Sequence, residues 1–513
     1  MALRLNHYKL HRVPEPLDSQ FVTNGQGQAV TPVWKESWQL AIESTRRDFL
    51  KAAGAAGLAS VPSKYSAWLT QRVSALNTWV TDDNRRLSPA EPVGLSTSSK
   101  LAVDTVTVDY ETIHQTILGF GAAFTDAACY LFSRLTDAQR TALFHQLFNA
   151  SEMSLNVCRT CIGAADSATE LYSYDEGAPD PDLKRFSIEH DRPYVLPMLR
   201  EAGRISNELF LFSSAWSPPG WMKDNGSMLG GCMRHTYMPS YANYLAQFIR
   251  AYAAEGVKID AITVQNEVDA DQQGLMPACF WPQEYEADFV RLHLGPRFAE
   301  AGISAKIWII DHNYNLWGRA IAELETPEVR KYTNAIAWHG YSGQPEWMSR
   351  VHDAFPDVEM YWTEGSPDYN DPEYSRCWAV WGQKFIAILG NHCRSITAWN
   401  FATDEHGRPN IGPYPCGGLL TIDSKTNDVY HSGQYYALGH FSRFVRRGAV
   451  RIGSEGNAAD LYHCAFRNPD GTIVIVLANP GTARTCQLRL HQQSASISLS
   501  ANSVTTLVSV MAN

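Results

Sequence analysis

The chain has 513 residues, of which 45% are hydrophobic, and a formal net charge of -10. This composition can bury a large core, so it excludes a disordered chain and favours one large domain with a smaller one. The negative charge and the lack of long basic runs exclude nucleic acid as the expected partner. Because no apolar stretch approaches the roughly 20 residues that a membrane-spanning helix needs, no transmembrane segment is expected.

The first part of the chain contains a segment that resembles a bacterial export signal. It reads Ser44-Thr-Arg-Arg-Asp-Phe-Leu-Lys51 and continues into a weakly apolar run of Ala and Gly. Two arginines before such a run, here Arg46 and Arg47, are typical of twin-arginine signals. We interpret residues 44–67 as this signal and residues 1–43 as an N-terminal extension, which predicts a periplasmic or secreted protein. A helix start with two surface arginines is the alternative.

From residue 117 the chain alternates short apolar runs, which are rich in β-branched and aromatic residues, with amphipathic helical segments. Eight such runs predict eight strands, at residues 117–124, 154–161, 208–216, 261–267, 306–313, 335–341, 359–365 and 395–402.

The segments between the predicted strands have helical periodicity, for example residues 136–145, 239–256 and 282–301. Alternation of strands and helices indicates parallel pairing, and eight units predict an α/β fold, a (β/α)8 TIM barrel at residues 117–429. A doubly wound sheet is the alternative fold, although no Gly-rich phosphate loop follows the first strand.

The last part of the chain has a different pattern, with short strands and turns. Residues 460–467 and 472–478 flank the turn Asn468-Pro-Asp-Gly471 and predict a hairpin. Residues 100–116 alternate in the same way before the barrel. We therefore predict an accessory antiparallel β-sandwich domain formed by residues 100–116 with 430–513, and we interpret the Ser-, Thr- and Pro-rich residues 68–99 as a linker.

Ten cysteines are scattered along the chain, and Cys158 and Cys161 are the only close pair. A CxxC pair can mark a redox or zinc site. Here it lies within a predicted strand, where residues three apart face opposite sides, and no second pair completes a zinc set. We interpret both as structural thiols.

The carboxyl ends of barrel strands form the active site in this fold, so the residues there predict the chemistry. Glutamates stand at only two predicted strand ends, Glu267 on the fourth strand and Glu364 on the seventh. Two carboxyl groups across a cleft lined with Trp and Tyr are what glycoside hydrolysis requires: one protonates the leaving oxygen and the other attacks the anomeric carbon. We also expect Arg159 and Tyr341 to hydrogen-bond Glu364 and keep it ionised.

Other strand-end residues have alternative interpretations. Asp311 and His312 offer metal ligands, but no third ligand at fixed spacing follows, so hydrogen-bonded structure is favoured. His339 fits either a sugar contact or a core histidine. The segment Trp216-Ser-Pro-Pro-Gly-Trp221 fits either a sugar platform or a rigid turn.

Six motifs in the same order resemble glycoside hydrolase family 30, the glucosylceramidase-like retaining β-glycosidases. They are Leu118-Gly-Phe-Gly-Ala-Ala-Phe-Thr-Asp-Ala-Ala128, Ser214-Ala-Trp-Ser-Pro-Pro-Gly-Trp-Met-Lys-Asp-Asn-Gly226, Val264-Gln-Asn-Glu267, Trp338-His-Gly-Tyr341, Tyr361-Trp-Thr-Glu364 and Leu438-Gly-His-Phe-Ser-Arg-Phe444. The likeness runs from about residue 100 to the C-terminus. It implies a barrel joined to a β-sandwich and a retaining hydrolase of β-linked sugars.

The resemblance implies Glu267 as the acid/base and Glu364 as the nucleophile. It places further residues around the sugar: Asp126, Trp216, Asn266, His339 and Trp399. The expected substrate is a β-glucosyl group on a saccharide or glycolipid, as in glucosylceramide, with β-1,6-glucan or a β-xyloside as alternatives. No cofactor and no metal are expected. A catalytically silent carbohydrate-binding protein is the alternative from another class.

The chain departs from the family pattern at two positions near the site. Val268 follows Glu267 where relatives often have proline, so the loop after the fourth strand is expected to differ. Gly340 stands where relatives often carry an aromatic residue, which predicts a more open pocket rim. Contacts to the aglycone are expected in the loops at residues 269–280 and 407–418.

Overall fold

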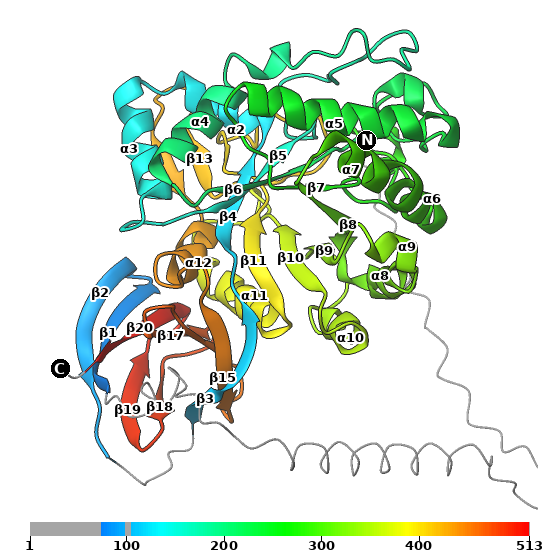
Figure 1. Cartoon of the computed structure of the whole chain (residues 1–513). Helices are drawn as coiled ribbons and strands as arrows, with labels where there is room; N and C mark the ends of the chain where they lie inside the picture. Colours follow the sequence, from blue (N-terminus) through cyan, green and yellow to red (C-terminus); the bar gives the residue numbers. More distant parts are fainter. Residues whose placement is uncertain (1–72, 98–103, 512–513) are drawn as a thin grey trace, which may run out of the picture. The chain divides into compact units, whose positions relative to one another are not determined.

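A computed structural model describes residues 73–97 and 104–511 of the chain. The signal-like segment at residues 44–67 and the extension before it lie outside these residues. The described part contains an eight-stranded parallel barrel and a nine-stranded β-sheet (Figure 1). None of its helices is both long and apolar enough to cross a bilayer.

The barrel is closed, and its strands pair in parallel in the order β10-β11-β4-β5-β6-β7-β8-β9. All eight predicted strands are present, so the (β/α)8 prediction is confirmed and the doubly wound alternative is wrong. Their bounds are β4 (Gly119–Phe124), β5 (Val157–Cys161), β6 (Phe210–Ser214), β7 (Ala261–Thr263), β8 (Lys306–Asn313), β9 (Ala335–His339), β10 (Glu359–Glu364) and β11 (Cys393–Ala398).

The barrel interior is layered, because side chains alternate along each strand. Apolar residues fill one layer, where Trp308 stacks on Tyr361 with ring centroids 4.2 Å apart. The members of this buried layer are Val157, Phe212, Ala261, Trp308, Ala335, Ala337 and Tyr361. Polar side chains follow toward the carboxyl ends of the strands. The apolar layer thus supports the polar groups of the site from below.

Helices surround the barrel. Their bounds are α2 (Asp126–Arg134), α3 (Asp137–Phe148), α4 (Val195–Ile205), α5 (Met238–Ala254), α6 (Gln283–Asp288), α7 (Gly295–Ala301), α8 (Trp317–Leu324), α9 (Pro327–Arg330), α10 (Trp347–Ala354), α11 (Trp378–Gly390) and α12 (Gly433–Ser442). A π-helical turn, Phe289–Leu294, joins α6 to α7. The start of α3 shows how the sequence sets a helix end: Thr136 and Gln139 form a reciprocal capping box.

The nine-stranded sheet has the order β19-β18-β3-β15-β16-β17-β20-β1-β2. Its strands are β1 (Val73–Asp82), β2 (Arg85–Gly94), β3 (Thr105–Thr116), β15 (Val450–Gly456), β16 (Tyr462–Arg467), β17 (Ile473–Asn479), β18 (Arg484–Leu490), β19 (Gln493–Leu499) and β20 (Ser503–Met511). All neighbours are antiparallel except β18 and β3. A bridge from Ser96 to Ser494 brings the two ends of the sheet together around a separate apolar core.

The interpretation of residues 68–99 as a linker is wrong for the described part of that range. Residues 73–94 form β1 and β2, and β1 pairs with β20 on one side and with the edge strand β2 on the other. Two register shifts in the pairing of β1 with β2 accompany an irregular burial pattern, which hid the two-residue alternation. Strand β2 contains Pro89 and Pro92, which a strand at a sheet edge tolerates because it pairs on one side only.

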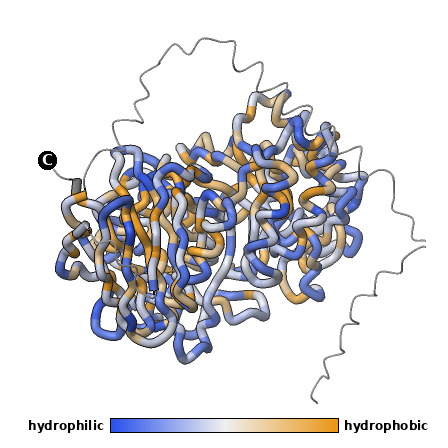
Figure 2. Tube along the Cα trace, turned by 90° about the horizontal axis from the view of Figure 1, so that it is seen from below, coloured by the Kyte–Doolittle hydropathy of each residue, from blue (hydrophilic) through white to orange (hydrophobic). Residues whose placement is uncertain are grey.

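The boundary between barrel and sheet also lies later than the predicted residue 429. The chain passes through a small sheet of β12 (Ala402–Thr403), β13 (Leu420–Ile422) and β14 (Val429–His431), then through α12, before β15 begins. Helix α12 covers β4 and also contacts β20, where His440 makes hydrogen bonds to Thr506 and Thr81. Figure 2 shows many hydrophobic residues, in orange, on inner stretches of the trace, and many hydrophilic residues, in blue, on its outer turns.

All ten cysteines lie in the described part and are free thiols. Cys158 packs in the main core, whereas Cys161 packs beside Trp216 and Trp399. The two therefore face different clusters, as expected for structural thiols.

The role of β1 in the sheet can be tested by truncating one side chain. Leu76 is completely buried in the core of the sheet. We expect Leu76→Ala to lower the free energy of unfolding by about 2–5 kcal/mol, through lost burial and the cavity that remains. Urea denaturation measures the change. Asn77→Ala, at the exposed neighbour, is the control and should stay within about 0.5 kcal/mol of the parent. Equal stability of the Leu76 variant would contradict the assignment.

Candidate active site

A cavity of about 470 Å³ opens at the carboxyl ends of the barrel strands. This size is within the range of small-molecule sites. The residues that line it are Asp166, Trp216, Asn266, Glu267, Ala270, Gln272, Met276, His312, Asn313, Tyr341, Glu364, Ser366, Pro367, Asp368, Trp399, Tyr414, Pro415 and Cys416. Both predicted glutamates are among them.

The buried guanidinium of Arg159, on β5, connects the polar groups beneath the cavity. It donates to Glu364 through Nη1 and, through Nη2, to Asp311 Oδ2 at 2.7 Å and Asn266 Oδ1 at 2.8 Å. Its Nε donates to Ser214 Oγ at 3.0 Å. Four N–H groups of this planar group are thus directed at acceptors on four different residues, which fixes the acceptors relative to one another.

Glu364 ends β10 and receives a second hydrogen bond from Tyr341, whose hydroxyl lies 3.1 Å from Oε1. The ion pair with Arg159 and this hydrogen bond both favour the ionised carboxylate. The structure therefore has both contacts that the sequence predicted for Glu364. An ionised carboxylate of this kind can act as a nucleophile.

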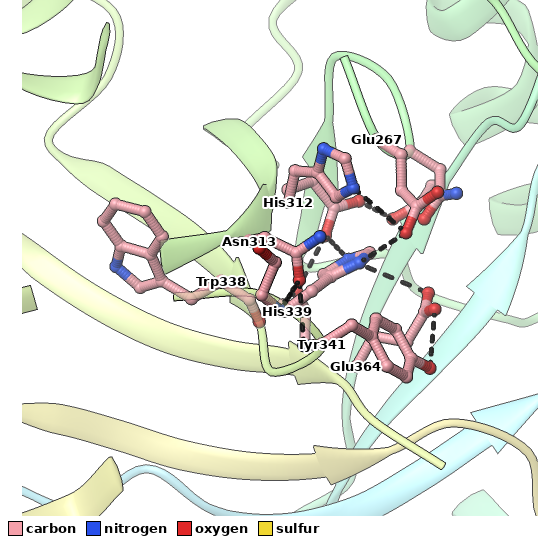
Figure 3. Close-up of polar contacts among 12 residues, drawn as sticks. Glu267, His312, Asn313, Trp338, His339, Tyr341 and Glu364 are labelled. Atoms are coloured by element: carbon pink, nitrogen blue, oxygen red, sulfur yellow. Dashed lines mark hydrogen bonds and ion pairs between the residues drawn. The ribbon is translucent and has the colours of Figure 1, made fainter. Parts of the chain in front are cut away.

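Glu267 lies across the cavity from Glu364, with His339 between them (Figure 3). Its backbone has a φ of 56°, in the left-handed region that non-glycine residues rarely occupy. Its Oε1 lies 3.3 Å from His339 Nδ1 and 3.2 Å from His312 Nε2, and its Oε2 accepts from Gln272. The strained backbone and these contacts hold the carboxyl group at one position above the barrel.

The spacing of the two carboxyl groups indicates which chemistry they can perform. One oxygen of Glu267, one of Glu364 and a ring nitrogen of His339 all lie within 4.8 Å of one another. Retaining glycosidases have carboxyl groups about 5–5.5 Å apart, whereas inverting enzymes leave about 6.5–9.5 Å for a water molecule. An upper limit of 4.8 Å between these oxygens is shorter than the inverting separation and agrees with the closer, retaining arrangement.

The same three groups offer the donor atoms that a divalent cation would need. However, Glu364 is already paired with the Arg159 guanidinium, and His339 Nε2 lies 3.0 Å from Asp311 Oδ1. A fixed positive charge beside the donors opposes a second cation. The arrangement therefore fits a pair of carboxyl groups with separate roles better than it fits a metal centre.

Electrostatics distinguish Glu267 from an ordinary buried acid. Burial raises the pKa of its carboxyl group, but His312 and His339 more than offset this, and the pKa lies below its usual range. Burial lowers the pKa of His312, whereas Glu267 and Asp269 raise it above its ordinary value. Glu267 and His312 therefore form an ion pair that contains one shared proton.

A bulge in β8 explains how the consecutive residues Asp311 and His312 both serve the site. The pairing of β8 with β9 shifts register between Ile310 and His312, and Ile310 and Asp311 have φ values of 75° and 44°. A bulge redirects side chains that would otherwise alternate. Asp311 thus binds Arg159 inside the barrel, while His312 lines the cavity.

Two tryptophans form one wall of the cavity. Trp216 and Trp399 stack with ring centroids 4.9 Å apart, and the Arg159 guanidinium lies 4.5 Å from the Trp216 ring centroid. Flat aromatic faces suit the apolar faces of sugar rings. Trp221 is instead packed in the core, with its indole N–H donating to the Asp175 carbonyl. Of the two tryptophans in this segment, Trp216 lines the cavity and Trp221 does not, so a sugar platform stays a prediction for Trp216.

Four of the predicted substrate-binding residues line the cavity: Trp216, Asn266, Tyr341 and Trp399. Arg159 and His339 are fully buried beneath it and act on the two glutamates. Asp126 is the exception, because Thr169 and His190 occupy both of its carboxylate oxygens. Asp126 does not line the cavity, and its side chain holds a loop, so its contact with the sugar stays a prediction.

Asp166 is an acidic residue of the cavity lining that was not among the predicted site residues. It is buried, and burial together with the charges of Glu364 and Glu267 raises its pKa to about 7. The sequence offers a signal, an acidic residue five positions after β5. However, the loop between them gives no periodicity from which its direction could be predicted.

Two loops meet over the cavity. The amide of Gln272 donates to Glu267 through Nε2 and accepts through Oε1 from the Tyr414 hydroxyl at 2.6 Å. Gln272 and Gln273 both have positive φ values, so this loop turns sharply. The expectation that residues 269–280 and 407–418 reach the substrate is consistent with this contact, although neither Gln272 nor Tyr414 was identified individually.

The two departures from the family pattern have different outcomes. Val268 is fully buried, and its carbonyl accepts from Trp281 at 2.7 Å, so it anchors the loop after β7. A side chain at Gly340 would meet the Trp362 ring at 2.9 Å. The Trp362 ring thus leaves no room there, and the expected opening of the pocket rim at Gly340 is not supported.

Comparison with known protein families agrees with this geometry. The glycosyl hydrolase family 30 TIM-barrel domain matches residues 117–445, and the family's beta sandwich domain matches residues 448–507. This chain belongs to glycosyl hydrolase family 30. It is therefore a glycoside hydrolase of a family that acts with retention on β-glycosides.

Relatives of the family 30 chain include enzymes on different β-glucosides. An endo-1,6-beta-D-glucanase of Neurospora crassa is 33% identical over 385 residues, which cover 71% of this chain and 79% of the relative. Putative glucosylceramidase 2 of Caenorhabditis elegans is 29% identical, with coverage of 73% and 76%. The lysosomal acid glucosylceramidase of Mus musculus is 28% identical, with coverage of 73% and 77%.

Solved structures share the two-domain architecture. SrfJ from Salmonella typhimurium has a TM-score of 0.81 and 25% identity, and the match covers 85% of this chain and 99% of that one. The endo-beta1,6-glucanase BT3312 has a TM-score of 0.77 and 27% identity, with coverage of 85% and 99%.

The raised pKa of Asp166 makes a prediction about stability. The pKa of Asp166 is higher in the folded state than in the unfolded chain, so the folded state holds the proton more tightly. The contribution of this group to the free energy of unfolding is therefore present at low pH and is lost as pH rises from about 4 through about 7. We expect Asp166→Asn to stabilise the protein by a few kcal/mol at about pH 8 and to have little effect near pH 4. Thermal unfolding at both pH values measures the difference. A variant that is destabilised more at high pH than at low pH would contradict it.

Proposed function

We propose that the chain hydrolyses β-glucosyl linkages with retention, using Glu364 as nucleophile and Glu267 as acid/base. The observation that carries this proposal is the placement of the two carboxyl groups, with oxygens within 4.8 Å of each other above a cavity walled by tryptophan. The environments of the two groups support their assignment, because Glu364 is paired with Arg159 and Tyr341 whereas Glu267 is in contact with proton-bearing histidines.

In the first step Glu364 attacks the anomeric carbon as the bond from that carbon to the leaving oxygen breaks. The leaving oxygen keeps the electron pair and takes a proton from Glu267. Arg159 donates a hydrogen bond to Oδ1 of Asn266. The side-chain N–H groups of Asn266 are thus available to a hydroxyl of the sugar. The guanidinium keeps Glu364 ionised until the covalent bond forms.

In the second step a water molecule replaces the leaving group. The Glu267 carboxylate takes a proton from this water as its oxygen bonds to the anomeric carbon, and the bond from that carbon to Glu364 breaks. Two inversions restore the β configuration. Tyr341 and Arg159 stabilise the returning carboxylate charge, since both donate to Glu364.

The two candidate substrates share the β-glucosyl group and differ in the leaving group. The glucosylceramidase-like relatives support a glycolipid substrate. The 33% identity to an endo-1,6-glucanase supports β-1,6-glucan as a second candidate. Because Gln272 and Tyr414 bridge the loops on the leaving-group side, these loops are expected to distinguish a sugar from a lipid aglycone.

A panel of defined β-glycosides tests the substrate. We expect the purified protein to release aryl alcohol from an aryl β-glucoside, and we compare glucosylceramide, β-1,6-glucan and an aryl β-xyloside by product release. No turnover on any of them would contradict the enzymatic proposal and favour a silent carbohydrate-binding protein.

The roles of the two glutamates make separate predictions. Glu364→Gly should lower turnover by at least about 10³-fold, and azide should restore it with an α-glucosyl azide as product, because azide then attacks in place of the carboxylate. Glu267→Ala should instead accumulate glycosyl-enzyme from an activated substrate, detected by mass spectrometry. An α-glucosyl azide formed by the Glu267 variant would reverse the assignment.

The signal-like segment supports export as a separate proposal. In a bacterial host with a twin-arginine translocase, replacing both Arg46 and Arg47 by Lys should keep the protein in the cytoplasm. Cell fractionation and immunodetection measure the distribution, and Arg4→Lys serves as a control substitution outside the motif. Unchanged export of the double variant would argue against this pathway.

A further inference from the structure

The proposed acid/base raises a chemical problem that a lone carboxyl group does not solve. Glu267 must hold a proton before the leaving oxygen departs, yet its contacts with His312 and His339 favour its ionised form. Both of its oxygens are already hydrogen-bonded, Oε1 to the two histidines and Oε2 to Gln272. The proton for catalysis therefore has to come from a neighbouring group.

His312 is the neighbour that is placed to supply it. The bulge in β8 directs its ring into the cavity wall, where Nε2 lies 3.2 Å from Glu267 Oε1 (Figure 3). On the other side of the ring, Nδ1 contacts Asp269 Oδ1. An imidazole held between two carboxylates is protonated on both nitrogens, with one N–H directed at each partner.

The charged and titratable groups around His312 come from four elements. Glu267 and Asp269 follow β7, and Asp311 lies on the same strand as His312. On β9, the His339 ring lies 5.7 Å from that of His312 in an edge-to-face arrangement. Burial raises the pKa of Asp269, but its hydrogen bond to His312 and the charge of His312 lower it, and the charge of Arg319, from α8, adds to this lowering.

His339 is less suited to this role than His312. Its Nε2 lies 3.0 Å from Asp311 Oδ1 and 3.7 Å from Glu364 Oε2, and it is fully buried. It therefore bridges both glutamates and belongs to the network that orients them. Among the described residues, the ring of His312 pairs with Glu267 and Asp269 and lines the cavity, so proton transfer from its ring to a catalytic carboxyl group concerns Glu267.

We propose that His312, anchored by Asp269, is a positioning residue that holds the proton which Glu267 delivers to the leaving group. This inference rests on the proposed function. The proton moves from His312 Nε2 to Glu267, which leaves a neutral imidazole that still donates from Nδ1 to Asp269. Glu267 then gives this proton to the leaving oxygen as the glycosidic bond breaks. In the second step the proton taken from water returns from Glu267 to His312, so charge and protons balance over the cycle.

The Glu267–His312 pair determines the pH above which the enzyme no longer holds the proton that it gives to the leaving group. In the native protein the active form is lost when the Glu267–His312 pair releases its shared proton, which requires alkaline pH because the two carboxylates retain it on His312. His312→Gln keeps a hydrogen-bond donor beside Glu267 but removes the titrating group. The basic limb of kcat/KM should then move to lower pH by at least about one unit.

The leaving group provides a second measurement that a structural defect would not reproduce. With an alkyl β-glucoside, which needs a proton, we expect His312→Gln to lower kcat/KM by about tenfold or more at neutral pH. With a dinitrophenyl β-glucoside, whose leaving group needs no proton, the formation of glycosyl-enzyme should stay within about threefold of the parent. Asp269→Asn should shift the basic limb in the same direction by a smaller amount, and it provides a second variant should His312→Gln not fold.

His406→Gln is the matched control, because His406 is exposed on a loop and its one ion pair is with the adjacent Glu405. Its pH profile should equal that of the parent. An unchanged basic limb in both His312→Gln and Asp269→Asn, or equal losses on the two substrates, would overturn the inference while leaving the glycosidase proposal intact. A parent protein that hydrolyses no β-glucoside would instead overturn the proposed function, and this inference with it.

Discussion

The site depends on a single buried charge, the guanidinium of Arg159. A buried cation is costly unless it is paired and fully hydrogen-bonded, and here Asp311 and Glu364 supply the opposite charges. Because the guanidinium is planar, its partners on β6, β8 and β10 and beyond the end of β7 must occupy fixed directions around it. The position of the nucleophile and that of Asn266 therefore follow from the same group.

The layered interior of the barrel explains why this charge can exist there. On β5, the apolar Val157 is followed two residues later by Arg159, and on β6 Phe212 is followed in the same way by Ser214. The period of two places a polar layer directly above an apolar one. The lower layer excludes water, and the upper layer supplies the hydrogen bonds. Stability and catalysis thus use alternate positions of the same strands.

Much of this arrangement could be predicted from the sequence, because strand periodicity and the ends of parallel strands are local properties. The eight strands, Glu267, Glu364 and the contacts of Glu364 follow from them. What could not be predicted depends on irregular backbone: the bulges of β1, the direction of Asp166 after its loop, and the meeting of Gln272 with Tyr414. The contacts of Asp126 have the same origin, since its partners Thr169 and His190 come from a long loop without periodicity.

The bulge in β8 also constrains how this part of the chain can change in evolution and in engineering. In a regular strand, the next side chain on the same face as Trp308, in the apolar layer, would be two residues later. The bulge within residues 308–312 adds one residue, so Asp311, three residues after Trp308, lies beside Arg159. Deleting Ile310 would give a regular strand, in which Asp311 follows Trp308 by two residues and stays on the inner face, whereas His312 alternates to the outer face. His312 would then lose its contacts with Glu267 and Asp269. In this strand the number of residues matters as much as their identity, so a deletion here is expected to be more damaging than most substitutions.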